Sequence, residues 1–268
     1  MQKRFVIFGL AAIAAISVLA YPLVDTIRSP DSSSPPGSLR VAVSDDYYPF
    51  GYISRKTGER KGFDVEMAKA LCEQMKTECK YEYLPLNLIM QKLRAREVDM
   101  AVADLGKSPE RSKFLAFSDP YNRSLSFFIT NVPELAPISK VDPKKLRIGV
   151  LFDSLQHHRL IRDYASQGAS IHAFRNHPDI VTALKKGDVN MWLTDGLPGY
   201  AVLKDPTHKD LHIAGNYPYN DPDITESRIV VPLDEKFLIP HINEALLQLK
   251  ARGRYQELLH KYFPSIHY

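Results

Sequence analysis

The stretch LRVAVSDDYYPFGYI, from Leu39 to Ile53, and the stretch KGFDVEMAKALC, from Lys61 to Cys72, contain the patterns that decide the fold. Residues 39–43 are apolar apart from Arg40, which is typical of a buried strand. From Val65 onward apolar residues recur at intervals of three and four, which predicts a helix, and Asp64 stands where its carboxylate could cap it. A buried strand followed by a helix indicates an α/β fold with a mostly parallel sheet.

The same alternation continues along the chain and then restarts. After strands over 80–84 and 98–103, with a helix over 88–95 between them, a second set begins at the apolar strand pattern 146–151. A connector over 124–131 separates the two sets. Further strands are expected over 171–174, 189–194, 211–215 and 228–231. Further helices are expected over 154–165 and 179–186, from 197, and over 238–251 and 253–262.

Two such sets predict two lobes. We expect residues 39–127 and 226–268 to form lobe 1 and residues 128–225 to form lobe 2, so that the end of the chain returns to the first lobe. Ligands of open α/β sheets bind at the carboxyl ends of the strands. Two lobes whose strand ends face each other would enclose a cleft, and this cleft is the expected binding site.

The N-terminal residues have a different character. Lys3 and Arg4 precede an apolar run over 5–24, which predicts either a cleaved signal peptide or an uncleaved membrane anchor over residues 1–24. Residues 25–38 are rich in serine and proline, as in a flexible linker. Both alternatives put the lobes outside the cytoplasmic membrane, in the periplasm, with or without a tether.

Composition and charge narrow the function classes. The 268 residues carry 35 Lys and Arg against 31 Asp and Glu, a formal net charge of +4, with no basic stripe that would indicate nucleic-acid binding. Cys72 and Cys79 would meet an oxidising compartment, where they either form a bridge or remain two buried thiols. No metal site is expected, because two cysteines alone cannot build a structural zinc site and no histidine cluster lies at ligand spacing beside them. The histidines are interpreted as solvated residues of helices and loops: His157, His158, His172 and His177.

Several segments together resemble the periplasmic amino-acid-binding proteins of ABC importers, the bacterial solute-binding family 3. They are the two stretches quoted above, KSPERSKFLAFSDPY (107–121), GDVNMWLTD (187–195) and INEALLQLKARGRYQELLHKYF (242–263). The resemblance implies a type II periplasmic-binding-protein fold, with two lobes joined by a hinge of two crossing strands. The spacing of Cys72 and Cys79 is similar to that of the histidine and lysine/arginine/ornithine binders, which implies a disulfide.

The resemblance puts Arg111 and Asp195 on opposite sides of the cleft. In the family, the arginine of the SPER motif grips a ligand carboxylate, and the planar guanidinium matches that group. The aspartate after the second-lobe strand accepts a hydrogen bond from the ligand ammonium group. The structural alternatives are a surface arginine that caps a short helix, and an aspartate that serves as the N-cap before Leu197.

The resemblance also implies further ligand contacts. Tyr47 corresponds to the aromatic lid that stacks on the ligand side chain, with Tyr48 one position away as the alternative. The start of the first lobe-2 helix, near residues 153–155, would help to hold the carboxylate through its backbone N–H groups. The remaining candidate ligand contacts are Leu86, Asp104, Gly106, Ser154 and Leu155.

The chain departs from the family at some of these positions. Gly106 lacks a hydroxyl group that would clasp a ligand, and Ser44 replaces an acidic residue that binders of basic amino acids use. Asp104 adds a negative charge, which favours a cationic ligand if the side chain faces the cleft. If Asp104 pairs with Lys107 or Arg111 instead, it neutralises the site. The identity of the ligand side chain therefore stays open.

These features predict a solute-binding protein that closes around an amino acid or analogue, uses no cofactor, is a monomer, and serves an ABC permease. We expect no enzymatic activity, since the sequence contains no recognisable nucleophile–base pair and no phosphate-binding loop. Two other functions stay open. One is a membrane-tethered ligand sensor or adaptor, and the other is an enzyme on the same fold, such as a cyclohexadienyl dehydratase.

Overall fold

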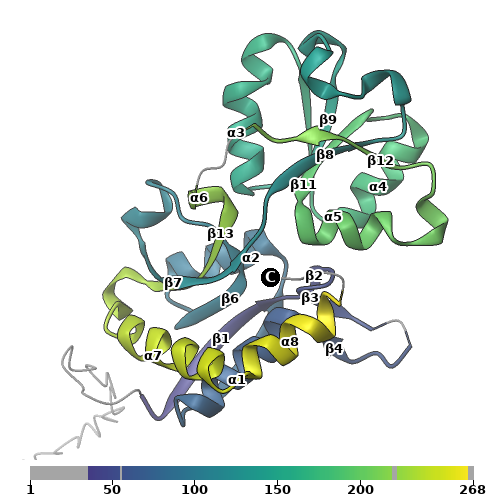
Figure 1. Ribbon diagram of the computed structural model, residues 1–268. Helices are drawn as coiled ribbons and strands as arrows, with labels where there is room; N and C mark the ends of the chain where they lie inside the picture. The colour runs from purple at the N-terminus through teal and green to yellow at the C-terminus, as the bar shows by residue number, and fades with distance from the viewer. Residues whose placement is uncertain (1–35, 55, 219–221, 265–268) are drawn as a thin grey trace, which may run out of the picture.

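The computed structural model describes residues 36–54, 56–218 and 222–264 and divides them between two lobes of similar build (Figure 1). Each lobe contains one five-stranded sheet with helices on both faces, which is the predicted α/β class. The predicted signal peptide or anchor and most of the linker lie outside the described residues. Ser38, the last residue of that linker, is the first residue of a strand. Within the described part of the chain, no helix combines the length and apolar character needed to cross a membrane.

Lobe 1 is built around the sheet β5-β1-β6-β13-β7. β1 (Ser38–Ser44) pairs in parallel with β5 (Glu78–Leu84) and with β6 (Met100–Leu105). β13 (Glu226–Pro232) lies antiparallel between β6 and β7 (Leu115–Arg123). A strand from the last part of the chain therefore lies inside the sheet that the first part begins.

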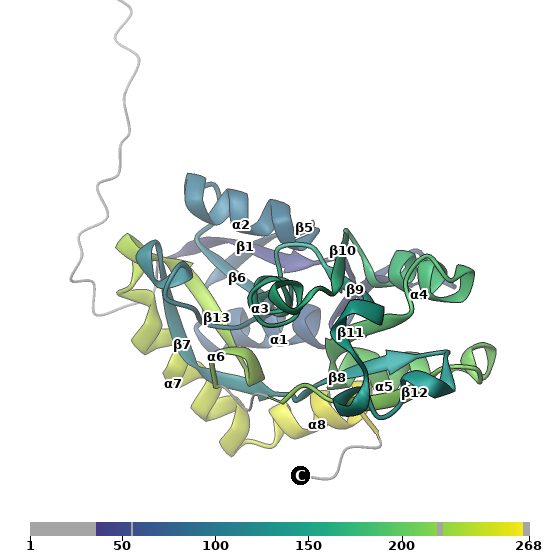
Figure 2. The same ribbon diagram turned by 90° about the horizontal axis from the view of Figure 1, so that it is seen from above.

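Helices cover both faces of this sheet (Figure 2). Alternate residues of each strand point to opposite sides, and apolar side chains on both sides need to be covered. Val41 and Val43 lie in the larger core of the lobe, and Ala42 lies in the smaller core on the other face. α2 (Leu86–Ala95) covers the smaller core. The larger core is covered by α1 (Phe63–Gln74), α7 (Leu238–Ala251) and α8 (Arg254–Tyr262).

Lobe 2 has the sheet order β10-β9-β11-β8-β12. α3 (Leu155–Asp163) packs on one face, and α4 (His177–Lys186) and α5 (Gly196–Leu203) pack on the other. The fully buried Trp192 belongs to the core under α4. The strands of this sheet are β8 (Ser126–Thr130), β9 (Arg147–Leu151), β10 (Ser170–Phe174), β11 (Met191–Asp195) and β12 (His212–Asn216).

The chain crosses between the lobes twice. One crossing consists of residues 124–125, between β7 and β8, and the other connects β12 to β13 and contains α6 (Pro222–Thr225). The Ser124 N–H donates to the Thr225 carbonyl at 2.8 Å, so the two crossings lie side by side. β8 begins at Ser126, slightly before the expected start of lobe 2 at residue 128.

A small three-stranded sheet that the sequence pattern does not predict lies next to α1. It consists of β2 (Asp46–Tyr47), β3 (Gly51–Ile53) and β4 (Arg60–Lys61). The expectation that Asp64 caps α1 is wrong, because Gly62 occupies the cap position and Asp64 lies buried in the first turn.

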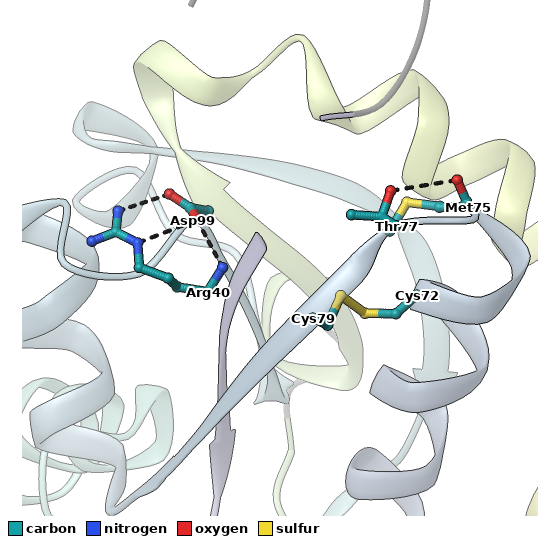
Figure 3. The surroundings of a disulfide bond; sticks show 6 residues. All are labelled: Arg40, Cys72, Met75, Thr77, Cys79 and Asp99. Atoms are coloured by element: carbon teal, nitrogen blue, oxygen red, sulfur yellow. Dashed lines mark hydrogen bonds and ion pairs between the residues drawn. A yellow bond between two sulfur atoms is a disulfide. The ribbon is translucent and has the colours of Figure 1, made fainter. Parts of the chain in front are cut away.

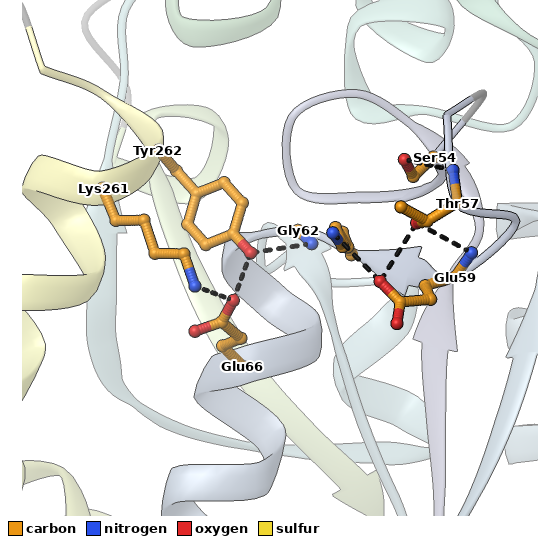
Figure 4. A network of polar contacts seen from close by, with 8 residues as sticks. Ser54, Thr57, Glu59, Gly62, Glu66, Lys261 and Tyr262 are labelled. Atoms are coloured by element: carbon orange, nitrogen blue, oxygen red, sulfur yellow. Dashed lines mark hydrogen bonds and ion pairs between the residues drawn. The ribbon is translucent and has the colours of Figure 1, made fainter.

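The last turn of α8 is fastened to the start of α1 (Figure 4). The Gly62 N–H donates to the Tyr262 hydroxyl at 3.2 Å, and that hydroxyl donates to the Glu66 carboxylate. Lys261 Nζ lies 2.6 Å from Glu66 Oε1. Gly62 has a φ of 142°, and a Cβ there would lie 2.0 Å from the Phe50 carbonyl oxygen, so this close approach requires glycine.

Cys72, near the end of α1, and Cys79, on β5, form a disulfide, which confirms the expected bridge (Figure 3). Their Cα atoms lie 6.2 Å apart. In the turn between them, Thr77 Oγ1 donates to the Met75 carbonyl at 3.4 Å. The bridge lies at the amino-terminal end of β5 and therefore at the end of lobe 1 remote from the strand carboxyl ends.

Candidate ligand-binding site

A cavity of about 590 Å³, part of it open to solvent, lies between the lobes at the carboxyl ends of β1, β6, β9 and β11. The structure brings all the predicted ligand contacts to this one cavity. They are Tyr47, Leu86, Asp104, Gly106, Arg111, Ser154, Leu155 and Asp195.

Arg111 enters the cavity wall from lobe 1, as the first residue of the short helix η1 (Arg111–Lys113). It is 7% exposed, which excludes the alternative of a surface arginine. Nη1 donates to the Gly106 carbonyl at 2.9 Å, and Nη2 donates across the cleft to the Asp153 carbonyl at 3.2 Å. Burial lowers the pKa of Arg111 to about 10, so the guanidinium is still cationic at neutral pH.

Asp195 faces the cavity from lobe 2, at the end of β11. Its Oδ1 accepts hydrogen bonds from Gln156 Nε2 at 2.6 Å and Ser126 Oγ at 3.2 Å, and its Oδ2 accepts one from the Tyr47 hydroxyl at 2.7 Å. It occupies the N-cap position of α5 without a side-chain capping bond. Burial, followed by the charge of Asp104, raises the pKa of Asp195 to about 7.

Tyr47 connects the two lobes. Its ring stacks on Phe50 of lobe 1, with ring centroids 5.3 Å apart, and on His177 of lobe 2, with centroids 4.8 Å apart. The expectation of a solvated His177 is therefore wrong, since this ring is 8% exposed and lies between aromatic groups. Tyr48, the alternative lid residue, is 54% exposed and does not line the cavity in the described part of the chain.

Asp104 lines the cavity near the end of β6. Its Oδ1 accepts hydrogen bonds from the Ser227 hydroxyl and from Asn122 Nδ2, the latter at 3.3 Å. Among the described residues it forms no ion pair with Lys107 or Arg111, so the neutralised alternative is not observed. Burial raises the pKa of Asp104, against the effect of these hydrogen bonds.

The remaining predicted residues form the walls where the lobes approach each other. A Cβ added to Gly106 would lie 2.6 Å from Leu155 Cδ1 and 2.4 Å from the Asp223 carbonyl oxygen. Ser154 is the N-cap of α3, and Leu86 is the first residue of α2. The cavity is therefore narrow at Gly106, where only a residue without a side chain fits between lobe 2 and a crossing segment.

Sequence reasoning missed several lining residues. Gln156 bonds to the lobe-2 carboxylate, but it becomes recognisable only when the first turn of α3 is folded. Ser227 lines the cavity, and Ser126 donates to Asp195 without lining the cavity; both come from strands next to the crossings, for which no motif was available. Asp46 also lines the cavity, and burial, together with the charge of Asp45, raises the pKa of Asp46 to about 6. The acidic pair before Tyr47 was the one available signal for it.

Comparison with known proteins gives a family match over the whole two-lobed region. The family model of the bacterial extracellular solute-binding proteins, family 3, matches residues 39–265. The ABC transporter arginine-binding protein 1 of Escherichia coli (strain K12) is 29% identical over 232 residues, covering 85% of this chain and 91% of the relative. The lysine/arginine/ornithine-binding periplasmic protein of the same strain is 26% identical over 256 residues, covering 92% and 96%. The histidine-binding periplasmic protein of that strain is 24% identical over 237 residues, covering 85% of this chain and 88% of the relative.

Solved structures agree with this match in their fold. An ancestral arginine-binding protein bound to arginine superposes with a TM-score of 0.76 at 24% identity, covering 85% of this chain and 99% of that one. An amino acid ABC transporter substrate-binding protein from Streptococcus pneumoniae bound to L-arginine gives 0.75 at 23% identity, covering 85% and 95%. The family match and the shared two-lobed type II fold lead to one conclusion: this chain belongs to the bacterial extracellular solute-binding proteins, family 3.

Proposed function

We propose that this protein binds a free α-amino acid between its lobes, outside the cytoplasmic membrane, and delivers it to an ABC permease. The observation that carries the proposal is that Arg111 of lobe 1 and Asp195 of lobe 2 line the same cavity. A guanidinium matches a carboxylate, and a buried carboxylate accepts from an ammonium group. A zwitterion between them would contact both lobes.

The charges of the cavity favour a cationic side chain on that amino acid. Asp46, Asp104 and Asp195 line it, whereas Arg111 is the one cationic side chain among its described lining residues. A zwitterion has no net charge, so the cavity keeps its excess of negative charge for a further positive charge on the ligand. The relatives named as binders of histidine, of arginine, and of lysine, arginine and ornithine support this class of ligand.

The two lobes would close on a ligand because the closed form offers it contacts that the open form lacks. Arg111 already donates to a carbonyl group of each lobe, and Tyr47 donates to Asp195 across the cleft. A ligand that offers a carboxylate and an ammonium group between the lobes adds charge-assisted bonds that an open form lacks. A ligand shifts the equilibrium between the open and closed forms only by the difference in its affinity for the two forms.

We infer a role in binding rather than in catalysis, supported by relatives that are named as binding proteins. One solved neighbour, an ancestral amino-acid-binding protein described as a precursor of cyclohexadienyl dehydratase, shares the fold with a TM-score of 0.73 at 21% identity. No group of three or more His, Cys, Asp or Glu side chains suited to a metal ion occurs in the described residues. Incubation with prephenate and arogenate should leave both compounds intact, and turnover of either would overturn this inference.

The proposal is tested by calorimetry and thermal unfolding with the common amino acids, ornithine and citrulline. L-Arginine should bind and raise the unfolding temperature by mass action. L-Citrulline, a neutral analogue of similar shape, should bind at least about 10-fold more weakly, because it leaves the excess carboxylates without a cation.

Arg111→Gln should lower the affinity about 100-fold, because it removes the charged donors for the ligand carboxylate. Arg94→Gln is the matched control, since Arg94 stacks on Phe114 at 4.4 Å and does not line the cavity in the described residues. No binding of any amino acid in this set, or equal loss in both variants, would contradict the proposed function.

A further inference from the structure

Two carboxylates reach the cavity from opposite lobes, and a tyrosine hydroxyl group donates to one of them. Asp104 stands near the end of β6 in lobe 1, and Asp195 stands at the end of β11 in lobe 2. The Tyr47 hydroxyl donates to Asp195 Oδ2 at 2.7 Å, and Tyr47 lines the same cavity as both aspartates. A phenol carries one proton, so it satisfies one carboxylate and leaves the other facing a second negative charge.

Asp104 is held firmly in this position. Its Oδ1 accepts hydrogen bonds from Asn122 on β7, the strand before the first crossing, and from Ser227 on β13, the strand after the second crossing. Its own N–H donates to the Tyr121 hydroxyl at 3.0 Å. Its backbone has a φ of 49°, a left-handed conformation that costs free energy in most residues and is tolerated best by Asn, Asp and Gly.

Asp195 is equally fixed, by donors from Tyr47, Gln156 and Ser126. These neutral donors supply no positive charge to the carboxylate. Burial and the neighbouring acid raise the pKa of both Asp104 and Asp195.

The other ionisable groups around the pair do not neutralise it. Asp64 and Tyr121 lie behind Asp104, Asp46 shares the cavity wall, and His177 lies behind Tyr47. Arg111 lines the same cavity, but its guanidinium donates to the carbonyl groups of Gly106 and Asp153. The surroundings of the pair therefore contain more acids than bases.

We propose that Asp104 and Asp195 form one ammonium-binding site shared by the lobes, which holds a single proton until the ligand's ammonium group replaces it. The ligand half of this proposal rests on the proposed function. An ammonium group brings one positive charge and three N–H donors, which suits two carboxylates better than the single phenolic proton does. The displaced proton passes to the solvent, and no covalent bond is made or broken apart from that O–H bond.

The sign of the pH dependence follows from this exchange. A protonated pair competes with the ammonium group, so the affinity should rise with pH through the range in which the pair loses its proton. It should stop rising when the pair is fully ionised. A site with one ionised aspartate and a hydroxyl would show no such rise near neutral pH.

The first test asks whether Asp104 and Asp195 share a proton in the absence of ligand. It is an NMR titration of the protein labelled with ¹³C at the aspartate carboxyl carbons. The wild-type protein should show Asp195 titrating near pH 7. In Asp104→Asn its midpoint should fall by about one pH unit or more, because the neighbouring charge is gone. Asparagine suits position 104 because it tolerates the left-handed backbone and keeps the Oδ1 acceptor. In the reciprocal variant, Asp195→Asn, the midpoint of Asp104 should fall.

Asp46→Asn is the matched control, because Asp46 lines the same cavity and should titrate near pH 6. This variant should remove that signal and leave those of Asp104 and Asp195 unchanged. If all three aspartates are ionised by pH 5, or if the Asp195 midpoint is the same in Asp104→Asn, the shared proton does not exist.

The exchange is tested with L-arginine by calorimetry at pH 7 in phosphate and in Tris, whose enthalpies of ionisation differ. The wild-type protein should release a fraction of a proton per bound arginine, and Asp104→Asn should release less. Binding with no proton release in the wild-type protein would overturn the exchange. If arginine does not bind while the coupled titration is present, the failure belongs to the proposed function and the shared proton stands.

Discussion

At the scale of single residues, the buried polar groups between the lobes are the informative ones. His177, at the start of α4, stacks on Tyr47 and packs against Trp192 with ring centroids 5.4 Å apart. Neither of its ring nitrogens has a hydrogen-bond partner in the described part of the protein. Burial lowers the pKa of His177 to about 4, so the ring is neutral in the folded protein at physiological pH.

We predict that His177 makes the protein less stable as the pH falls. Its folded pKa of about 4 is below the unfolded value of 6.5, so between these values only the unfolded chain binds the proton. This contribution should cost roughly 2 kcal/mol of unfolding free energy between pH 7.5 and pH 5. His177→Phe keeps an aromatic ring and should remove that loss, measured by urea unfolding at both pH values.

His260→Phe is the control for this prediction, because His260 is exposed on α8 and lies outside the aromatic stack. It should leave the pH dependence as it is in the wild-type protein. If the unfolding free energy of His177→Phe depends on pH as that of the wild-type protein does, the buried ring is not the cause of the loss and the prediction is wrong.

At the scale of elements, α1 and β5 are joined covalently as well as by packing. The Cys72–Cys79 bridge has a sequence separation of 7 and joins the end of the helix to the beginning of the strand. A short loop of this kind restricts the unfolded chain only moderately, because the entropy of closing a loop grows slowly with its length. The bridge stabilises lobe 1 without contributing any atom to the cavity wall.

We predict that replacing both Cys72 and Cys79 with alanine lowers the unfolding free energy by about 2–3 kcal/mol. The affinity for the ligand should be unchanged, because the bridge lies at the far end of β5 from the cleft. Urea unfolding and calorimetry of the variant and of the wild-type protein measure both quantities. Reductant should destabilise the wild-type protein and have no effect on the variant, and a loss of affinity in the variant would contradict the prediction.

The elements also show what sequence reasoning could reach. Strands and helices with a continuous apolar run or a regular period were predicted close to their observed bounds, as for α7 (Leu238–Ala251). Arg111 and Asp195 were found because each follows a buried strand within a family motif. The strands β2 to β4 have two or three residues each, too few for any periodicity to emerge.

The environment of a residue was harder to predict than its element. His177 was misread because one of the rings that packs against it is Tyr47, which belongs to the other lobe. Asp64 has the residue type and approximate position of a helix cap, yet its Oδ1 accepts from the Tyr121 hydroxyl at 2.8 Å in the core. Contacts between residues far apart in the chain leave no local pattern, and these contacts decide both cases.

At the scale of the whole molecule, closure depends on how closely lobe 2 and the crossing segment approach Gly106. We predict that Gly106→Ala prevents full closure, because its Cβ would lie 2.4 Å from the Asp223 carbonyl oxygen and 2.6 Å from Leu155 Cδ1. The radius of gyration measured by X-ray scattering with L-arginine should stay larger than that of the wild-type protein, and the affinity should fall about 10-fold or more.

Gly37→Ala is the matched control, since a Cβ at Gly37 would meet no atom within 4 Å. It should close and bind as the wild-type protein does. A Gly106→Ala protein that reaches the wild-type radius with ligand would mean that the lobes can meet without this close approach.

The strand order of lobe 1 has a consequence for the order in which the molecule can be completed. β13 lies between β6 and β7, so a nascent chain cannot assemble this sheet until residue 232 has been synthesised. Lobe 2 needs nothing beyond Asn216 for its sheet, and α8 must still arrive to cover the core of lobe 1. The half of the protein that the ribosome starts first is thus the half that it finishes last.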